Sequence, residues 1–239
     1  MIPRVGFSLY MKKLFIIANW KSNKTIKETE KWFHDFDKEI KHNPFSLEDK
    51  EVIIAPSFTL LEHARYCSSN LKLHIKFGAQ DISSFEEGAY TGEVSAKQIK
   101  ELADYVIVGH SERRRYFGED KEIIKKKLRI SLQYTLTPIL CISEMNQILN
   151  LKSYILNHEI IVAYEPLFAI GSGHPDTPVN ADEMARGIKK ELGKIPVLYG
   201  GSVTSDNVKN FTSMPHIDGV LVGGASLDPL EFLNIVQNA

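Results

Sequence analysis

The chain has 239 residues, of which 43% are hydrophobic and 25% are charged, as in an ordinary soluble globular protein. Its formal net charge of −1 gives no whole-molecule attraction to nucleic acid or to an anionic membrane, so we expect neither as a partner. No apolar run approaches the ~18 residues that a membrane-spanning helix requires. Because the net charge gives no general attraction to anions, any anion that the protein binds must be held at a local site.

The two cysteines, Cys67 and Cys141, are weak evidence for an oxidising compartment in a chain of this length. We expect both to be reduced and the protein to be cytoplasmic. Residues 1–10 lack the apolar core and the cleavage site of a signal peptide. Met11 precedes two lysines and resembles a natural start, so we interpret residues 1–10 as an upstream extension or a segment that is not native.

Eight short apolar runs recur along the chain, and each has the length of a β-strand. They are 14–18, 51–55, 73–79, 105–109, 137–142, 160–164, 196–200 and 219–224. Most are continuously apolar rather than alternating, which is typical of parallel strands that are covered on both faces.

Helical patterns occupy the segments between these runs. Trp32, Phe33 and Phe36 repeat at the spacing of one buried helix face. Thr25 and Glu28 have the spacing of a capping box at the start of the same helix.

Further helix starts and one short helix follow later in the chain. We expect Asn180, with Glu183, to open one helix, and Asp228 followed by Pro229 to start the last. The apolar residues between 148 and 155 predict a short helix before the sixth run.

Alternating strands and helices of this number predict a single α/β domain, a closed (β/α)8 TIM barrel over residues 11–239. The alternative is an open, doubly wound sheet. The first strand is followed by Asn19-Trp20-Lys21 and not by the Gly-x-Gly-x-x-Gly of a dinucleotide site, which favours the barrel.

The segment after the sixth run suggests an acid–base group beneath a lid. Glu165 ends an apolar strand, and Pro166 stops that strand at once. The next four residues are apolar, and the glycines after them free the backbone. The predicted lid consists of Pro166, Leu167, Phe168, Ala169, Ile170, Gly171, Ser172 and Gly173.

In a parallel barrel the carboxyl ends of the strands meet on one face, where active sites are built. Each polar residue or glycine at these ends has an ordinary structural explanation when it is taken alone, such as a surface lysine or a turn. Their common placement favours one functional pocket. The residues are Asn19, Lys21, His110, Ser111, Glu112, Glu165, Ser202, Gly223 and Gly224.

An ordered set of motifs along the whole chain resembles the triosephosphate isomerase family. The motifs are ANWK (18–21), GAQ (78–80), GAYTGEVS (88–95), VGHSERR (108–114), YFGE (116–119), AYEPLFAIGSG (163–173), YGGSV (199–203) and GVLVGGASL (219–227). The resemblance implies interconversion of dihydroxyacetone phosphate and D-glyceraldehyde 3-phosphate through an enediol(ate), with no cofactor.

The same resemblance implies the roles of the catalytic residues. Glu165 would be the base, His110 would donate to the carbonyl oxygen and shuttle protons, and Lys21 would supply positive charge. Ser111 would orient Glu165 while the lid is open, and Glu112 would hold the ammonium of Lys21. The family is itself a standard example of a lid that closes over its substrate.

The resemblance also implies a substrate-binding set. Asn19 would add a hydrogen bond, and Gly171, Ser202 and Gly224 would offer backbone N–H groups to the phosphate. Gly223 would allow the close approach of that group. A short helix near Gly224 would direct its positive end at the anion.

The loop of residues 80–93 is too long for a compact barrel connection. It carries Phe85 and Tyr90, which would be exposed on a monomer. By the resemblance this loop inserts into a second subunit, with Thr91 near the neighbour's first strand, so we predict a twofold homodimer. The alternative is a loop packed on its own chain. A short helix is expected from Ser95.

The chain departs from the family pattern in four places. Phe168 replaces a tryptophan in the lid, and residues 174–176, His-Pro-Asp, replace Lys-Thr-Ala at its end. Ser143 replaces a glycine, and the segment 145–158 is short for the family. Pro175 restricts the backbone, so we expect an effect on lid motion.

Three other functions remain to be weighed. A Schiff-base aldolase would need a lysine where the sixth strand offers Glu165. A metal-dependent epimerase would need converging ligands, but only His110 is suitably placed, and no His-Glu-x-x-His or Cys-x-x-Cys occurs, so we expect no metal. A non-catalytic phosphosugar-binding or moonlighting adhesion protein is the alternative from another class.

Overall fold

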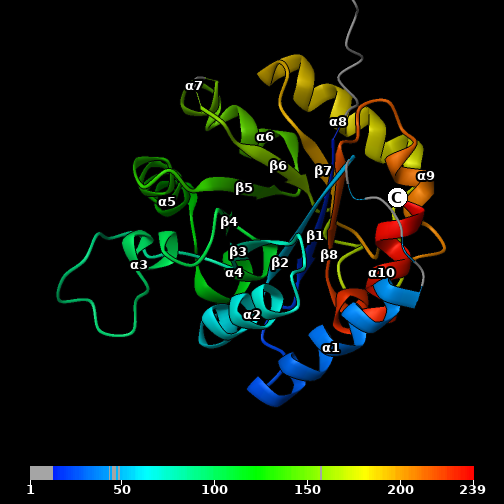
Figure 1. Cartoon of the computed structure of the whole chain (residues 1–239). Helices are drawn as coiled ribbons and strands as arrows, with labels where there is room; N and C mark the ends of the chain where they lie inside the picture. The colour runs from blue at the N-terminus through cyan, green and yellow to red at the C-terminus, as the bar shows by residue number, and fades with distance from the viewer. Residues whose placement is uncertain (1–12, 43, 45–46, 48, 157) are drawn as a thin grey trace, which may run out of the picture.

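The structure, a computed structural model, describes residues 13–42, 44, 47, 49–156 and 158–239. In this part of the chain eight parallel strands form a closed barrel in which β8 pairs with β1 (Figure 1). They are β1 (Leu14–Asn19), β2 (Lys50–Ala55), β3 (Lys76–Ala79), β4 (Tyr105–Val108), β5 (Thr137–Ile142), β6 (Ile161–Tyr164), β7 (Val197–Tyr199) and β8 (Gly219–Val222). The predicted TIM barrel is confirmed, and the open sheet is excluded. The predicted extension, residues 1–10, lies outside the described residues.

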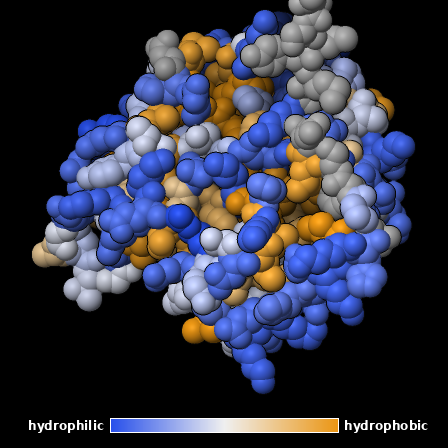
Figure 2. All heavy atoms as spheres, viewed as in Figure 1, coloured by the Kyte–Doolittle hydropathy of each residue, from blue (hydrophilic) through white to orange (hydrophobic). Residues whose placement is uncertain are grey.

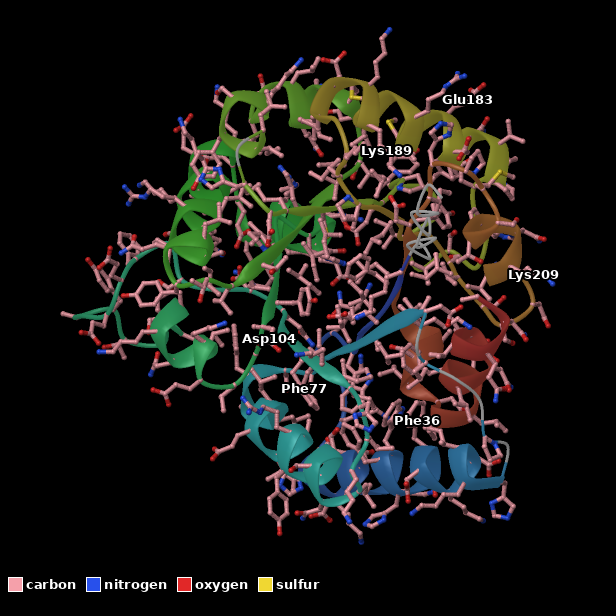
Figure 3. The ribbon with its side chains drawn as sticks, turned by 45° about the horizontal axis from the view of Figure 1, so that its top comes forward. Phe36, Phe77, Asp104, Glu183, Lys189 and Lys209 are labelled. Carbon is pink, nitrogen blue, oxygen red and sulfur yellow. The ribbon has the colours of Figure 1, made fainter. Side chains whose placement is uncertain are left out.

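Helices surround this barrel. They are α1 (Ile26–His42), α2 (Phe58–Asn70), α3 (Ala96–Lys100), α4 (Ser111–Phe117), α5 (Lys121–Gln133), α6 (Met145–Leu149), α7 (Lys152–Ile155), α8 (Pro178–Leu192), α9 (Val208–Thr212), the 3₁₀ helix η1 (Gly224–Leu227) and α10 (Pro229–Asn238). Figure 3 shows Phe36 and Phe77 in the interior, whereas Glu183 and Lys209 lie at the outer edge.

Most of the predicted helix starts are confirmed. The backbone N–H of Thr25 donates to Glu28 Oε2 at 2.7 Å and the N–H of Glu28 donates to Thr25 Oγ1 at 3.3 Å, which is the expected capping box. Asp228 caps α10, and Ser95 caps α3. The expected start at Asn180 is wrong, because Thr177 caps α8 and Pro178 fills its first turn.

Two predicted segments depart most from the sequence pattern, namely the third strand and the helix before the sixth strand. β3 begins at Lys76 rather than at residue 73, because the chain turns after α2 with Lys72 at φ 55°. The helix expected over 148–155 is divided into α6 and α7. Their apolar side chains Ile148, Leu151 and Ile155 are all buried.

The apolar strands are continuous because both of their faces are buried. One face packs against the helices, and the other fills the barrel interior. The interior cluster consists of Ile17, Ile53, Ala55, Ile107, Ile139, Cys141, Ile161, Ala163, Leu198 and Leu221. Cys67 and Cys141 are free thiols. The barrel interior is therefore filled by side chains, and the cavity described below lies above the carboxyl ends of the strands.

The outer surface is mostly hydrophilic on the face shown in Figure 2, with apolar patches between the polar side chains. Among the described residues no helix is both long enough and apolar enough to cross a membrane.

A buried ion network fixes the base of the loop 80–93. Lys127 on α5 is 4% exposed. Its Nζ donates to Asp81 Oδ1 at 2.6 Å and to Glu119 Oε1 at 2.5 Å. Arg113 on α4 contacts the same two carboxylates, at 2.8 Å from Asp81. The network therefore joins the loop to both helices that follow β4.

Replacing Lys127 tests this network. Lys127→Ala leaves two buried carboxylates with one cation fewer, and we expect the free energy of unfolding to fall by about 3–5 kcal/mol. The control is Lys126→Ala, an exposed lysine on the same helix, whose effect should stay within about 0.5 kcal/mol. Urea unfolding measures both, and equal effects of the two variants would contradict the assignment.

Candidate active site

A cavity of about 360 Å³ lies at the carboxyl ends of the strands. All of the predicted catalytic and substrate-binding residues line it, although they come from five separate segments of the chain. They are Asn19, Lys21, His110, Glu165, Gly171, Ser202, Gly223 and Gly224.

Lys21 lies in a strained turn directly after β1, with φ at 52°. Asn19 Oδ1 accepts the backbone N–H of Lys21 at 3.1 Å. The side-chain amide of Gln80 donates to the Lys21 carbonyl at 2.8 Å and to the Ala55 carbonyl at 2.9 Å. Lys21 Nζ donates to Glu112 Oε1 at 2.5 Å. The turn and the ion pair together direct the ammonium into the cavity.

His110 precedes α4 and serves as its N-cap. Its Nδ1 accepts the backbone N–H of Glu112 at 3.2 Å, so the hydrogen of a neutral ring lies on Nε2. Nε2 lies 3.1 Å from Glu165 Oε1. Burial lowers the pKa of His110, but the carboxylates of Glu165 and Glu112 together raise it, and the net shift of the His110 pKa is upward. If Glu165 turns away, its carboxylate no longer raises the pKa of His110. The backbone N–H of Glu112 still donates to Nδ1 and therefore opposes protonation of that nitrogen.

Glu165 follows β6 and is only 3% exposed. The backbone N–H of Ser111 donates to Oε2 at 3.3 Å, and the Ser111 hydroxyl has no hydrogen-bond partner among the described residues. Burial would raise the pKa of Glu165. His110, the Ser111 N–H and Lys21 together outweigh burial and hold the pKa of Glu165 below its ordinary value. The carboxylate is therefore ionised although it is buried.

Two glycine positions make room for these groups. A Cβ at Gly200 would lie 3.0 Å from Glu165 Cγ, and a Cβ at Gly201 would lie 2.5 Å from the Tyr199 hydroxyl. Any side chain at either position would displace the base or the tyrosine.

The far side of the cavity is built from the ends of β7 and β8. Ser202 has φ at 52°, and the side chain of Asn207 donates to its carbonyl at 3.0 Å. η1 begins at Gly224, and its first turn is closed by Ser226, whose N–H and hydroxyl both donate to the Gly223 carbonyl. The first N–H groups of a helical turn lack intrahelical acceptors, which suits an anion.

The lid of residues 166–173 does not pack its apolar tip against the protein. Leu167 and Phe168 are 68% and 65% exposed, whereas Ala169 is fully buried. Ser202 Oγ donates to the Ala169 carbonyl at 2.6 Å and accepts the Gly173 N–H at 3.1 Å. One serine thus contacts both the middle and the end of the lid.

Ser111 and Glu112, predicted to support Glu165 and Lys21, and Thr91, predicted as a dimer contact, do not line the cavity, and other side chains support its walls. Thr91 is exposed on the loop 80–93 and does not line the cavity. Gln80 and Asn207 act on backbone carbonyls, and Arg114 donates to the Gly109 and Cys141 carbonyls at 2.7 and 3.0 Å. Because backbone atoms are the targets, no spacing of side chains in the sequence marks these three.

Among the described residues no group of three or more His, Cys, Asp or Glu side chains is arranged to hold a metal ion.

Proton transfer needs an ionised base and a donor held close to it, and Glu165 and His110 meet both conditions. Both residues lie at the carboxyl end of a parallel barrel, which is where enzymes of this fold carry their active sites. The fold and the site together are those of a (β/α)8-barrel enzyme that uses acid–base chemistry.

The comparisons with known proteins narrow this class to one family. The family model of triosephosphate isomerase matches residues 14–239. The chain is 41% identical over 246 residues to a triosephosphate isomerase of Mesomycoplasma hyopneumoniae (strain 7448), covering 96% of this chain and 100% of that protein. Relatives of the same name from Aquifex aeolicus and Thermus thermophilus are 41% and 36% identical, over 95% and 96% of this chain and 100% of each relative. The chain belongs to the triosephosphate isomerase family.

The lowered pKa of Glu165 is measurable. Carbon-13 NMR should find the Glu165 carboxyl titrating below 4.5, and His110→Ala should raise this pKa, since His110 is the strongest of its stabilising neighbours. A depressed carboxyl pKa adds stability above the unfolded value that is lost as the pH falls through the folded pKa. The control is His63→Ala, whose ring contacts Glu30 on the surface. A downward shift in His110→Ala would contradict the assignment.

Proposed function

We propose that this chain interconverts dihydroxyacetone phosphate and D-glyceraldehyde 3-phosphate in the cavity, with Glu165, His110 and Lys21 as its catalytic residues. Intramolecular aldose–ketose isomerisation follows from membership of the family. The observation that carries the residue assignment is the buried, ionised Glu165, 3.1 Å from His110 Nε2, in one cavity with the Lys21 ammonium.

Glu165 acts as the base. It takes a proton from the substrate carbon next to the carbonyl, which leaves an enediol(ate), and it returns the proton to the neighbouring carbon. In the present arrangement its carboxylate faces His110 and the Ser111 N–H, so it must turn toward the substrate. Gly200 leaves the space in which this turn occurs.

His110 and Lys21 stabilise the charge that develops on oxygen. The neutral Nε2–H of His110 donates to the substrate carbonyl and passes protons between the two oxygens. Lys21 places an ammonium beside the same oxygens and the phosphate, and Asn19 adds a hydrogen bond. Glu112 holds the Lys21 side chain in position through the 2.5 Å ion pair.

The phosphate binds where β7 and β8 end, next to Lys21. The backbone N–H groups of Gly171, Ser202 and Gly224 receive it, and Gly223 has no side chain to block it. Gly171 belongs to the lid, so phosphate binding favours closure over Glu165. Closure excludes water and strengthens each electrostatic contact inside.

Removing the base tests the assignment. Glu165→Gln should lower kcat/KM by at least about 10²–10⁴-fold in a coupled assay with dihydroxyacetone phosphate, because proton abstraction lacks its base. Binding of glycerol 3-phosphate, an unreactive ligand with the same phosphate group, should be retained. The control is Glu159→Gln, an exposed residue before β6, which should keep the full rate. Full activity in Glu165→Gln would remove Glu165 from the mechanism.

The loop 80–93 supports a homodimer. It projects away from the barrel between β3 and α3 (Figure 1). Phe85 and Tyr90 stack at 4.3 Å between ring centroids, yet each is 44% exposed. A partner subunit would cover these rings and contact Thr91.

The free thiols Cys67 and Cys141 favour a cytoplasmic location.

Sedimentation at micromolar concentration tests the dimer. We expect two subunits for the natural sequence and a shift to monomer for Thr91→Arg, because a buried, unpaired charge opposes association. Ser153→Arg, an equal change at an exposed site on α7, should remain dimeric. A natural protein that sediments as a monomer would refute the homodimer.

A further inference from the structure

The residues after the lid depart from the family pattern, and one of them is a buried carboxylate. Asp176 lies between the lid and α8 and is 8% exposed. A charge in such a place must be held by hydrogen bonds, because burial of an isolated carboxylate is costly. The question is which parts of the protein these hydrogen bonds connect.

Asp176 contacts three separate elements. Its Oδ1 accepts the Thr177 N–H at 2.7 Å and the Asn180 side-chain amide at 3.1 Å, both at the start of α8. Its Oδ2 lies 3.5 Å from the Tyr164 hydroxyl at the end of β6. Its backbone N–H donates to the Tyr199 hydroxyl at the end of β7, at 2.8 Å.

These contacts connect the lid's end to the strands that carry the site. Tyr164 directly precedes Glu165, and Tyr199 directly precedes Gly200, the glycine that makes room for Glu165. The two tyrosine rings lie 6.5 Å apart between centroids. Asp176 is therefore hydrogen-bonded to the residue on each side of the base's surroundings, Tyr164 before Glu165 and Tyr199 before Gly200.

The contact with Tyr164 is looser than the others. An O–H···O hydrogen bond is usually about 2.5–3.0 Å long, so 3.5 Å leaves the pair incompletely formed while Leu167 and Phe168 are exposed. A movement of the hinge toward β6 by less than about 1 Å would complete the bond. Burial and the nearby Asp176 raise the pKa of Tyr164 to about 12, so its hydroxyl remains a donor at neutral pH.

Capping of α8 does not account for this carboxylate. Thr177 is already the N-cap, with its Oγ1 accepting the Asn180 N–H at 3.1 Å. Asp176 Oδ2 faces away from the helix start toward Tyr164. The side chain thus connects α8 to β6 in addition to stabilising the start of α8.

We infer that Asp176 is a positioning residue for the isomerisation, whose carboxylate draws the end of the lid toward the Tyr164 hydroxyl and so favours the closed position over Glu165. The inference rests on the proposed function. It assigns the effect of the altered residues 174–176 on the lid to the Asp176 side chain and its contact with the Tyr164 hydroxyl.

The test measures the fate of the intermediate as well as the rate. In the family, closure keeps the enediolate from eliminating phosphate: the carbon–oxygen bond breaks, the phosphate leaves with the electron pair, and the remaining enol becomes a dicarbonyl compound. Inorganic phosphate released per isomerisation therefore reports how well the lid covers the cavity. A loss of stability alone lowers the amount of active protein but not this ratio.

Three variants separate the possibilities. Asp176→Ala removes the whole set of side-chain contacts and should lower kcat/KM about tenfold and raise the phosphate ratio severalfold. Tyr164→Phe removes only the contact with Oδ2 and should raise the ratio in the same direction by less. Thr177→Ala removes the cap of α8 and should lower the melting temperature without changing the ratio.

The outcomes are distinct for the two proposals. An unchanged phosphate ratio in both Asp176→Ala and Tyr164→Phe, or an equal rise in Thr177→Ala, overturns the positioning role. If Asp176→Ala does not fold, the ratio in Tyr164→Phe alone decides. A natural protein without isomerase activity overturns the proposed function itself, before any variant is compared.

Discussion

The contact between Glu165 and His110 is the interaction on which the site depends. A buried carboxylate is tolerated only where donors surround it, and here an imidazole N–H and the Ser111 backbone N–H approach its two oxygens. The imidazole is itself fixed, because Nδ1 accepts an N–H from the first turn of α4. In the proposed mechanism the base is thus ionised and the donor is oriented before a substrate binds, and Glu165 turns toward the substrate.

The barrel supplies this arrangement because its strand ends converge. Lys21 follows β1, His110 follows β4 and Glu165 follows β6, so residues far apart in sequence line one cavity. The interior below this cavity is filled with apolar side chains. The residue at the end of β6 also argues against a Schiff-base aldolase on this fold, because that enzyme would need a lysine at the position of Glu165. In the proposed mechanism the lid links phosphate binding to catalysis, because Ser202 both contacts the lid and lines the cavity.

Much of this was predictable from sequence, and the failures have physical causes. The apolar strands and the capping box at Thr25 depend on local patterns, which the sequence records directly. The start of α8 was misplaced because the Thr-Pro pair outweighs the later Asn180 signal. Gln80 went unassigned because it holds a backbone carbonyl, and such a target carries no residue signature. Asp176 was visible only as a departure until its contacts with two strand ends were known.

The most direct test of the account is solvent hydrogen exchange during turnover. A single base that takes a proton from one carbon and returns it to the next must exchange that proton with water in some turnovers. In D₂O we predict deuterium at the carbon next to the carbonyl of the triose phosphates for the natural protein, and none for Glu165→Gln over the same period. Deuterium incorporated by Glu165→Gln at the natural rate would show that another group is the base and would contradict the account.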